Sequence, residues 1–263
     1  MGGGLVVSGV GALLVRTPRV LVPGRPLPLS SGSSPSDRDS LRDVYWPTTA
    51  TEAIAVQGEL REQVDTTGPG PSPVDTQYVA GLDVAYDGDD LAAAIVVLDA
   101  QSHIEVDRSI VLGHTTFPYL PGLFAFREVP ALLEALEGLT ITPDLLVCDG
   151  QGLAHPRRFG LACHLGVLTG LPTIGVAKNA FVGSYSPLGA QRGSSADLVL
   201  DGEVVGAVVR TQTDVKPVFV SVGHRVDLPT AIAHTLHLTP QYRLPETTRA
   251  ADHACRQAIS QRA

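Results

Sequence analysis

The sequence predicts one α/β domain in which helices flank a mixed β-sheet. Three strand-length apolar runs, at residues 78–86, 91–100 and 103–114, are separated only by short polar turns, a pattern typical of an antiparallel meander. After residue 123, segments with helical spacing alternate with short apolar runs, which indicates β-α-β connections. The chain is 44% hydrophobic and 17% charged, so it can bury a substantial core.

Composition limits the possible classes of protein. Apolar runs stay under about 10 residues, well short of the roughly 20 that a membrane span needs, so we expect no membrane association. Cys148, Cys163 and Cys255 are odd in number and show no CxxC spacing. This favours a reducing compartment, and we expect a cytoplasmic protein. The sequence contains no GxSxG, Walker A, HExxH or zinc-type Cys/His spacing, so serine hydrolases, nucleotidases and zinc enzymes lack support.

The N-terminal segment differs in composition from the rest of the chain. Residues 23–40 are rich in Pro, Ser and Gly, and such a segment cannot bury enough apolar surface to become ordered. We therefore predict a disordered extension over residues 1–42 and a single folded domain over residues 43–263. The first ordered element begins at Trp46.

The first predicted helix lies within residues 46–64, where Thr48 or Thr49 can cap its N-terminus. Its apolar stripe at helical spacing consists of Ala53, Val56, Leu60 and Val64. A linker rich in turn-forming residues over 66–75 separates this helix from the meander.

Two helix–strand pairs follow the meander, and three strands and two helices complete the chain. The pairs join a helix near 123–138 to a strand at 144–149, and a helix near 157–169 to a strand at 172–177. The remaining strands lie at 196–202, 204–211 and 216–224, with Gly202 in the first turn, and the remaining helices lie near 228–237 and 246–260. This order, with an acid on the first strand and another ending the fourth, favours a ribonuclease H-like fold.

Four acids occupy short, distinctive contexts at the edges of apolar runs: Asp83, Glu128, Asp149 and Asp252. Brought together, carboxylates form a hard, oxygen-lined site for divalent cations. Residues 76–150 carry 12 acidic and 2 basic side chains, an excess that bound cations would offset and that a solvated acidic surface would also explain. Residues 151–263 carry 11 basic and 7 acidic side chains, including groups suited to phosphate. The pattern predicts a metal-dependent nuclease.

The four acids differ in how much their positions reveal. Asp149 ends an apolar run and precedes a Gly-Gln-Gly turn, and the carboxyl ends of such strands are where α/β sheets bind ligands. Asp83 lies within a strand, so its side chain points away from those of Leu82 and Val84. If those two side chains face the core, Asp83 faces water. Surface exposure is likewise the simple interpretation of Asp252, whereas the position of Glu128 is uninformative by itself.

Basic residues follow Asp149 closely. His155 and Arg157 lie on the loop before a predicted helix, where backbone N–H groups and guanidinium groups favour an anion. Lys178 follows another strand and can reach the same rim as a point charge on a scissile phosphate. The alternative for His155 and Arg157 is a solvated basic loop, and the alternative for Lys178 is a solvent-exposed lysine at the end of a strand.

A rigid turn carries an aromatic and an aliphatic tip: Pro118, Tyr119, Leu120, Pro121 and Gly122. Such a wedge can enter a duplex and unstack a base. The alternative is a loop that is anchored on the core.

Six stretches, in order, resemble the endonuclease V family of deoxyinosine-directed repair nucleases: VAGLDVAY, PYLPGLFAFREVPALL, DGQGLAHPRRFGLACHLG, PTIGVAKN, VKPVFVSVGH and YRLPETTRAAD. The resemblance runs from about Trp46 to Arg256. It implies a ribonuclease H-like fold and hydrolysis that depends on Mg²⁺, with Mn²⁺ as a substitute. Cleavage is expected at the second phosphodiester bond 3′ to deoxyinosine, leaving 3′-hydroxyl and 5′-phosphate ends.

The resemblance also implies roles for individual residues. Asp83, Glu128 and Asp149 become the catalytic and metal-binding acids, and Lys178 lies with His155 near the scissile phosphate. Asp252 takes the place of a metal-site residue that is His in some members and Asp in others, although His253 stands beside it. The turn over 118–122 becomes the strand-separating wedge, with Gly122 lining the base pocket, and Arg157 joins the nucleic-acid contacts.

Two other functions remain open. One is an inosine-specific endoribonuclease, because related proteins act on RNA and the 2′-hydroxyl distinguishes the substrates. The other is a non-catalytic binder of deaminated nucleic acid. The expected partner is DNA that contains deaminated bases, and we expect a monomer.

Overall fold

Eight strands form a single mixed sheet in the computed structural model, which describes residues 46–262. The strands are β1 (Tyr78–Asp87), β2 (Asp90–Asp99), β3 (Glu105–His114), β4 (Leu145–Cys148), β5 (Thr173–Ala177), β6 (Ser195–Leu200), β7 (Glu203–Val209) and β8 (Val218–His224). The helices are α1 (Ala50–Arg61), α2 (Ala125–Glu137), α3 (Leu161–Thr169), α4 (Leu228–His237) and α5 (Glu246–Ser260). The predicted fold class is confirmed; the extension predicted over 1–42 lies outside the described residues.

The sheet order is β3-β2-β1-β4-β5-β8-β7-β6. β1, β2 and β3 form the predicted antiparallel meander. β4 pairs in parallel with β1 on one side and with β5 on the other, so these three central strands run in the same direction toward one edge of the sheet. The antiparallel strands β8, β7 and β6 complete the sheet. The β6–β7 turn places Asp201 and Gly202 at φ 56° and 83°, as a two-residue Asp-Gly hairpin turn requires.

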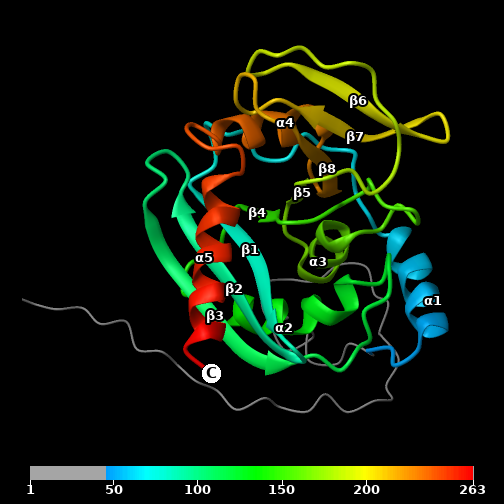
Figure 1. Ribbon diagram of the computed structural model, residues 1–263, viewed down its shortest axis with the longest axis vertical. Coiled ribbons are helices and arrows are strands. Elements are labelled where there is room, and N and C mark those ends of the chain that lie inside the picture. The colour runs from blue at the N-terminus through cyan, green and yellow to red at the C-terminus, as the bar shows by residue number, and fades with distance from the viewer. Residues whose placement is uncertain (1–45, 263) are drawn as a thin grey trace, which may run out of the picture.

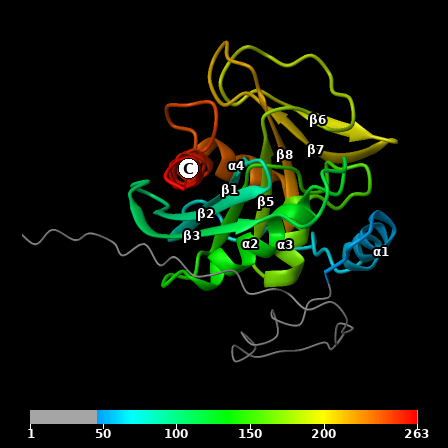
Figure 2. The same ribbon diagram turned by 60° about the horizontal axis from the view of Figure 1, so that its bottom comes forward.

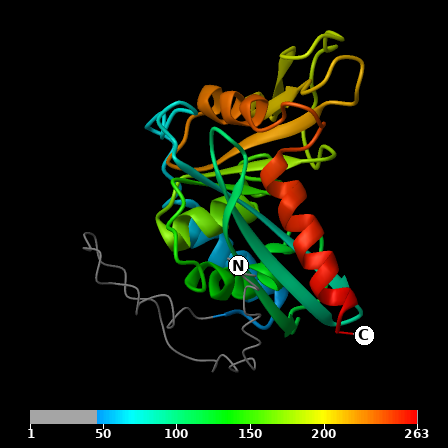
Figure 3. The same cartoon turned by 90° about the vertical axis from the view of Figure 1, so that its left-hand side faces the viewer.

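Helices cover both faces of the sheet. α5 and α4 pack on one face, and α2 and α3 pack on the other (Figure 1). Figure 2 views α5 nearly along its axis, with the meander between it and the pair α2 and α3. Figure 3 shows α5 crossing the strands of the meander obliquely. Within residues 46–262, no helix combines the length and hydrophobicity that a bilayer span requires.

Helix α1 begins as predicted but buries a different stripe. Thr49 is its N-cap, since the Thr49 hydroxyl accepts from the backbone N–H of Glu52 and the Glu52 carboxylate accepts from that of Thr49. The buried residues are Ala53, Gln57 and Leu60. Val64 lies beyond the end of the helix, so the predicted stripe was wrong at this position, and the buried Gln57 was missed.

Trp46 completes the hydrogen bonding of α2. Pro130 lies inside this helix and has no N–H, so it leaves the carbonyl of Phe126 without its usual helical donor. The indole Nε1 of Trp46 donates to that carbonyl at 2.9 Å. Trp46, where the first ordered element was predicted to begin, therefore compensates for a proline 84 positions later in the sequence.

Helix α3 begins later than the predicted residue 157. Arg158 adopts φ 55°, and Gly160 is an extended N-cap whose added Cβ would lie 2.3 Å from the carbonyl oxygen of Gln151. The segment before Leu161 is thus a turn packed on the Gly-Gln-Gly segment. This packing keeps the loop that follows Asp149 close to the sheet.

Candidate active site

Asp83 and Asp149 lie side by side on adjacent parallel strands. Leu82 of β1 pairs with Cys148 of β4, and the backbone N–H of Asp149 donates to the carbonyl of Leu82 at 3.3 Å. Asp83 directly follows Leu82, and Asp149 directly follows Cys148. Because Leu82 and Cys148 face the core beneath α2 and α3, the side-chain alternation of strands directs Asp83 and Asp149 toward the opposite face.

That opposite face is covered by α5, so Asp83 does not simply face water. Gly81 makes the close approach of α5 possible, because a Cβ at this position would lie 2.1 Å from the backbone carbon and oxygen of Thr247. Val84 packs toward the α2 side, as the strand pattern suggested. The expectation of exposure assumed a sheet with one covered face, whereas this sheet has two.

Helix α5 places Asp252, and not its neighbour, near Asp83. The charge of Asp252 acts on Asp83, whereas His253 is exposed. Arg256 Nε donates to Asp252 Oδ1 at 2.8 Å. Burial tends to raise the pKa of Asp252, but the hydrogen bond and the charge of Arg256 outweigh burial and lower it. Asp252 is therefore the acid that α5 contributes.

Glu128 reaches the same cluster from α2 and is buried, with a relative exposure of 6%. Burial raises the pKa of Glu128 well above its usual value, and the charges of Asp83 and Asp149 add to the effect. Burial also raises the pKa of Asp83 to about 7, again with a contribution from Asp149. Three acids that the sequence separates widely therefore lie within electrostatic reach of one another.

Lys178 joins this cluster through an ion pair. Its Nζ lies 2.5 Å from Asp149 Oδ2, because β4 and β5 run in parallel and end at the same edge of the sheet. Burial tends to lower the pKa of Lys178, but the hydrogen bond and the charge of Asp149 raise it above its usual value. The ammonium group thus stays positively charged beside the acids.

The donor set suits a hard divalent cation. Asp83 interacts electrostatically with Glu128, Asp149 and Asp252, and repulsion among these acids contributes to the raised pKa values of Asp83 and Glu128. A cation would relieve this repulsion. Oxygen donors are the ligands that Mg²⁺ and Mn²⁺ prefer. Among residues 46–262, however, no three His, Cys, Asp or Glu side chains form a ready-made metal-binding group. The chemistry and the charge of the acids fit such an ion without a preformed cage.

The loop over 118–122 is anchored on the core and also presents an exposed aromatic ring. Leu120 packs against a cluster that includes Phe117 and Phe126. Tyr119 is 69% exposed, and its ring meets that of Phe124 edge-on at 5.4 Å. Phe124 lies 6.1 Å from the ring of Tyr86. Both interpretations of the turn are therefore compatible with its structure.

His155 and Arg157 lie together behind this loop. His155 is buried, and its pKa falls to about 4 because of burial and the charge of Arg157. The guanidinium of Arg157 donates to Gln57 Oε1 and to the Gly122 carbonyl, both at 2.5 Å. The sequence suggested Arg157 as a phosphate ligand, but in the structure its guanidinium is hydrogen-bonded within the protein.

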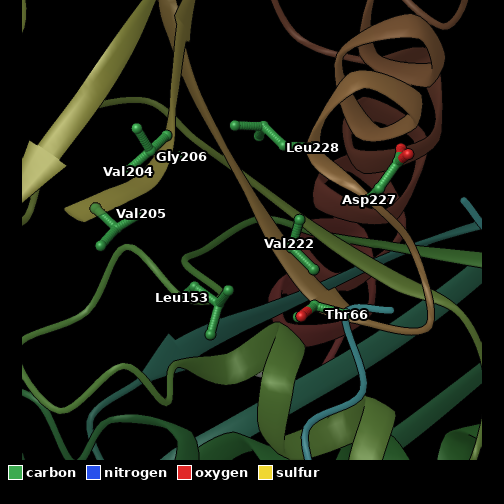
Figure 4. A pocket seen from close by; sticks show the side chains of 8 residues that line it. All are labelled: Thr66, Leu153, Val204, Val205, Gly206, Val222, Asp227 and Leu228. Carbon is green, nitrogen blue, oxygen red and sulfur yellow. The ribbon is translucent and has the colours of Figure 1, made fainter. Parts of the chain in front are cut away.

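A cavity of about 200 Å³ lies away from the four acids and from the 118–122 loop. It is lined by Thr66, Leu153, Val204, Val205, Gly206, Val222, Asp227 and Leu228 (Figure 4). Most of these side chains are apolar, and the Asp227 carboxylate accepts from the backbone N–H of Thr230 to cap α4. None of the predicted site residues lines this cavity, so its chemistry does not indicate the active site.

Comparison with known proteins identifies the family. A sequence model of endonuclease V matches residues 58–253, which is most of the chain. The chain belongs to the endonuclease V family. The endonuclease V of Streptomyces avermitilis is 60% identical over 218 residues, covering 82% of this chain and 95% of that protein. Its crystal structure matches at a TM-score of 0.79 and 59% identity, over 82% and 95% of the two chains.

A second solved endonuclease V carries a nucleic acid. The Ciona intestinalis protein, in complex with a 24mer DNA containing an inosine followed by a ribo-adenosine, matches at a TM-score of 0.70 and 27% identity. The match covers 81% of this chain and 98% of that one. Membership of endonuclease V makes this protein a nuclease that acts on phosphodiester bonds, and it confirms the resemblance drawn from the six sequence stretches.

Three residues near this endonuclease V site escaped the sequence analysis. Phe181 is 45% exposed and lies 5.5 Å from the ring of His155; its only signal is an aromatic residue shortly after Lys178. Arg243 Nη2 donates to the carbonyl of Lys178 at 2.5 Å, and its signal is its place in the YRLPETTRAAD stretch. The third is Gln57, and its signal is that a polar residue stands between the apolar residues Ala53 and Leu60 on one face of α1.

Proposed function

We propose that this endonuclease V family member cleaves deoxyinosine-containing DNA at the second phosphodiester bond 3′ to the lesion. The observation that carries the proposal is that Asp83 on β1 lies beside Asp149 and Lys178, which directly follow the parallel strands β4 and β5. Paired acids next to a fixed ammonium group suit the cleavage of a phosphodiester. The inosine-containing DNA bound by the Ciona relative supports the choice of lesion.

Mg²⁺ is the proposed cofactor, with Mn²⁺ as a substitute. Asp83 and Asp149 would hold one or two ions, and Glu128 and Asp252 would complete the shell directly or through water. When bound, such an ion lowers the pKa of a coordinated water and stabilises charge on the attacked phosphate. The acidic donor set supports this assignment.

The protein's own groups prepare the substrate. Lys178, held by Asp149, supplies a positive charge for the scissile phosphate. Tyr119 offers an exposed ring on which a base can stack, and a deaminated or mispaired base costs less to extrude than a paired one. The Nδ1 of His155 accepts from the backbone N–H of Arg157 at 3.2 Å. The neutral ring therefore carries its proton on Nε2, which faces the backbone of Gly122.

The test uses a labelled duplex with one deoxyinosine, incubated with Mg²⁺, with Mn²⁺ and with EDTA. We expect a nick at the second phosphodiester 3′ to the lesion with either metal and intact DNA with EDTA. A matched duplex with adenine in place of inosine is the control. A nick elsewhere, or cleavage in EDTA, would contradict the proposal.

An inosine-specific endoribonuclease is the second candidate. The ribo-adenosine that follows the inosine in the Ciona complex favours testing it, because a 2′-hydroxyl is what distinguishes RNA from DNA. DNA, RNA and a chimera of the same sequence therefore belong in the same assay. Faster cleavage of RNA would assign the protein to this class, and binding of inosine without cleavage of any strand would indicate a non-catalytic binder.

The cellular setting is inferred from the cysteines and the activity. Cys148, Cys163 and Cys255 are free and buried, which supports a reducing compartment such as the cytoplasm. We infer a role in DNA repair for a monomeric enzyme. Light scattering of the purified protein tests the monomer, and a dimeric mass would contradict it.

A further inference from the structure

A buried amide on α1 connects two loops of the candidate site. Gln57 has a relative exposure of 1%. Its Nε2 donates to the Gly122 carbonyl at 3.0 Å and to the Phe159 carbonyl at 3.2 Å, and its Oε1 accepts from Arg157 Nε. One side chain thus joins the end of the 118–122 loop to the segment that follows Asp149.

The position of Gln57 within α1 makes this role distinctive. Ala53 and Leu60 lie on the same face of the helix and pack into two different clusters, beneath the 117–123 segment and around Phe159 respectively. Gln57 stands between them, where an apolar residue would continue the stripe. Burying an amide is costly unless it is hydrogen-bonded, so a polar side chain here specifies geometry that an apolar one would not.

The Gly122 carbonyl is held from two sides. It accepts from Gln57 Nε2 and from Arg157 Nη2. Gly122 adopts φ 78°, and an added Cβ would lie 2.7 Å from Arg157 Nη2. The carbonyl orientation at the end of the loop is therefore set by these donors, and Tyr119 lies only three residues before it.

We propose that Gln57 is a positioning residue for lesion discrimination. It holds the 118–122 loop in a fixed position relative to the loop that carries His155. The inference rests on the proposed function, in which this loop reads the base. Gln57 acts through Gly122 and Arg157 and does not itself touch the substrate. Helix α1, at the periphery of the molecule (Figure 1), thereby gains a part in recognition.

The test compares Gln57→Met with Leu60→Ala. Methionine keeps the approximate volume of Gln57 and removes all three hydrogen bonds, whereas Leu60→Ala weakens the packing of α1 and retains them. Single-turnover cleavage of the inosine duplex is measured at several enzyme concentrations. The curve gives two separate quantities, the enzyme concentration at half-saturation (called half-saturation below) and the maximal rate. We expect Gln57→Met to raise half-saturation about tenfold, to lower the maximal rate by less, and to leave binding of the adenine duplex unaffected.

A second variant and a structural readout complete the design. Gln57→Glu keeps the acceptor for Arg157 but loses both donors, and we expect it to behave like Gln57→Met. Hydrogen exchange of residues 117–124 should accelerate in both variants, while exchange in β7 stays the same. If Leu60→Ala raises half-saturation equally at a comparable loss of thermal stability, or if half-saturation is unchanged in the Gln57 variants, the proposal is wrong.

Failure of the proposed function would look different. In that case the wild type itself would not cleave the inosine duplex. The exchange measurement then decides the positioning role alone, and unchanged exchange over 117–124 in Gln57→Met would overturn it.

Discussion

The Lys178 ammonium lies 2.5 Å from Asp149 Oδ2 and joins the residues that directly follow the parallel strands β5 and β4. The pair is partly buried, with side-chain exposures of 42% for Lys178 and 15% for Asp149. It keeps one positive charge next to a cluster of acids in which burial raises the pKa of Asp83 and Glu128. The same edge of the sheet therefore presents anionic groups and a cation that suits a phosphate.

We expect Asp149→Asn to abolish cleavage and to leave binding of the inosine duplex largely intact. The amide keeps the volume of the side chain but removes the charge, so the rate should fall by more than about a thousandfold. Single-turnover cleavage and fluorescence anisotropy measure the two properties. Asp197→Asn, on the exposed side of β6, is the control. Loss of binding together with cleavage would show that Asp149 is structural.

Tyr119→Ala should weaken the preference for inosine over adenine more than it slows the chemical step. Stacking of a base on an aromatic side chain contributes about 1–3 kcal/mol, so the preference should fall roughly tenfold. Tyr119→Phe keeps the ring and should retain the preference. Competition between inosine and adenine duplexes gives the ratio directly. An unchanged ratio in Tyr119→Ala would identify the turn as a scaffold element.

Gly81→Ala should reduce the free energy of unfolding by about 3 kcal/mol. The new methyl group would meet the backbone of Thr247, and neither β1 nor α5 can move without disturbing the core. Gly58→Ala is the matched control, because open space surrounds Gly58 on α1, and it should stabilise by about 0.5–1 kcal/mol. Urea denaturation measures both values. If Gly81→Ala unfolded at the same urea concentration as the wild type, the close packing of α5 on β1 would be contradicted.

His164 should make the protein less stable as the pH falls. It is fully buried among the rings of Trp46, Phe126 and Phe159, and burial lowers its pKa to about 3. Below pH 6.5 the unfolded chain binds a proton at this residue and the folded chain does not, so the free energy of unfolding decreases between about pH 7 and pH 3.

A comparison with His164→Phe isolates this contribution, because the other titrating groups are shared. Between pH 7.5 and pH 5 the wild type should lose about 2 kcal/mol more than the variant. The variant also removes two ring nitrogens that have no hydrogen-bond partner among the described residues, so it should be at least as stable at pH 7.5. Chemical denaturation at several pH values provides the measurement. Parallel pH profiles would rule out the proposed role of His164.

Most element boundaries could be predicted because they depend on local patterns. Alternating and helical periodicities located all eight strands and the five helices of the described chain, and Gly202 marked the turn between β6 and β7. Helix α3 was placed too early because its start depends on a contact with a segment outside the helix. Gly160 packs against Gln151, and only that close approach makes the preceding residues a turn.

The candidate site shows the same division. The sequence by itself determined the family and singled out the four acids and the 118–122 loop, since short motifs carry these features. Tertiary structure decided that Asp252 faces Asp83 while His253 is exposed, and that Arg157 bonds to Gln57 and Gly122. It also decided that Asp83 lies beneath α5. The physical reason is that a side chain's surroundings come from elements packed against it, and in this protein those elements are distant in sequence.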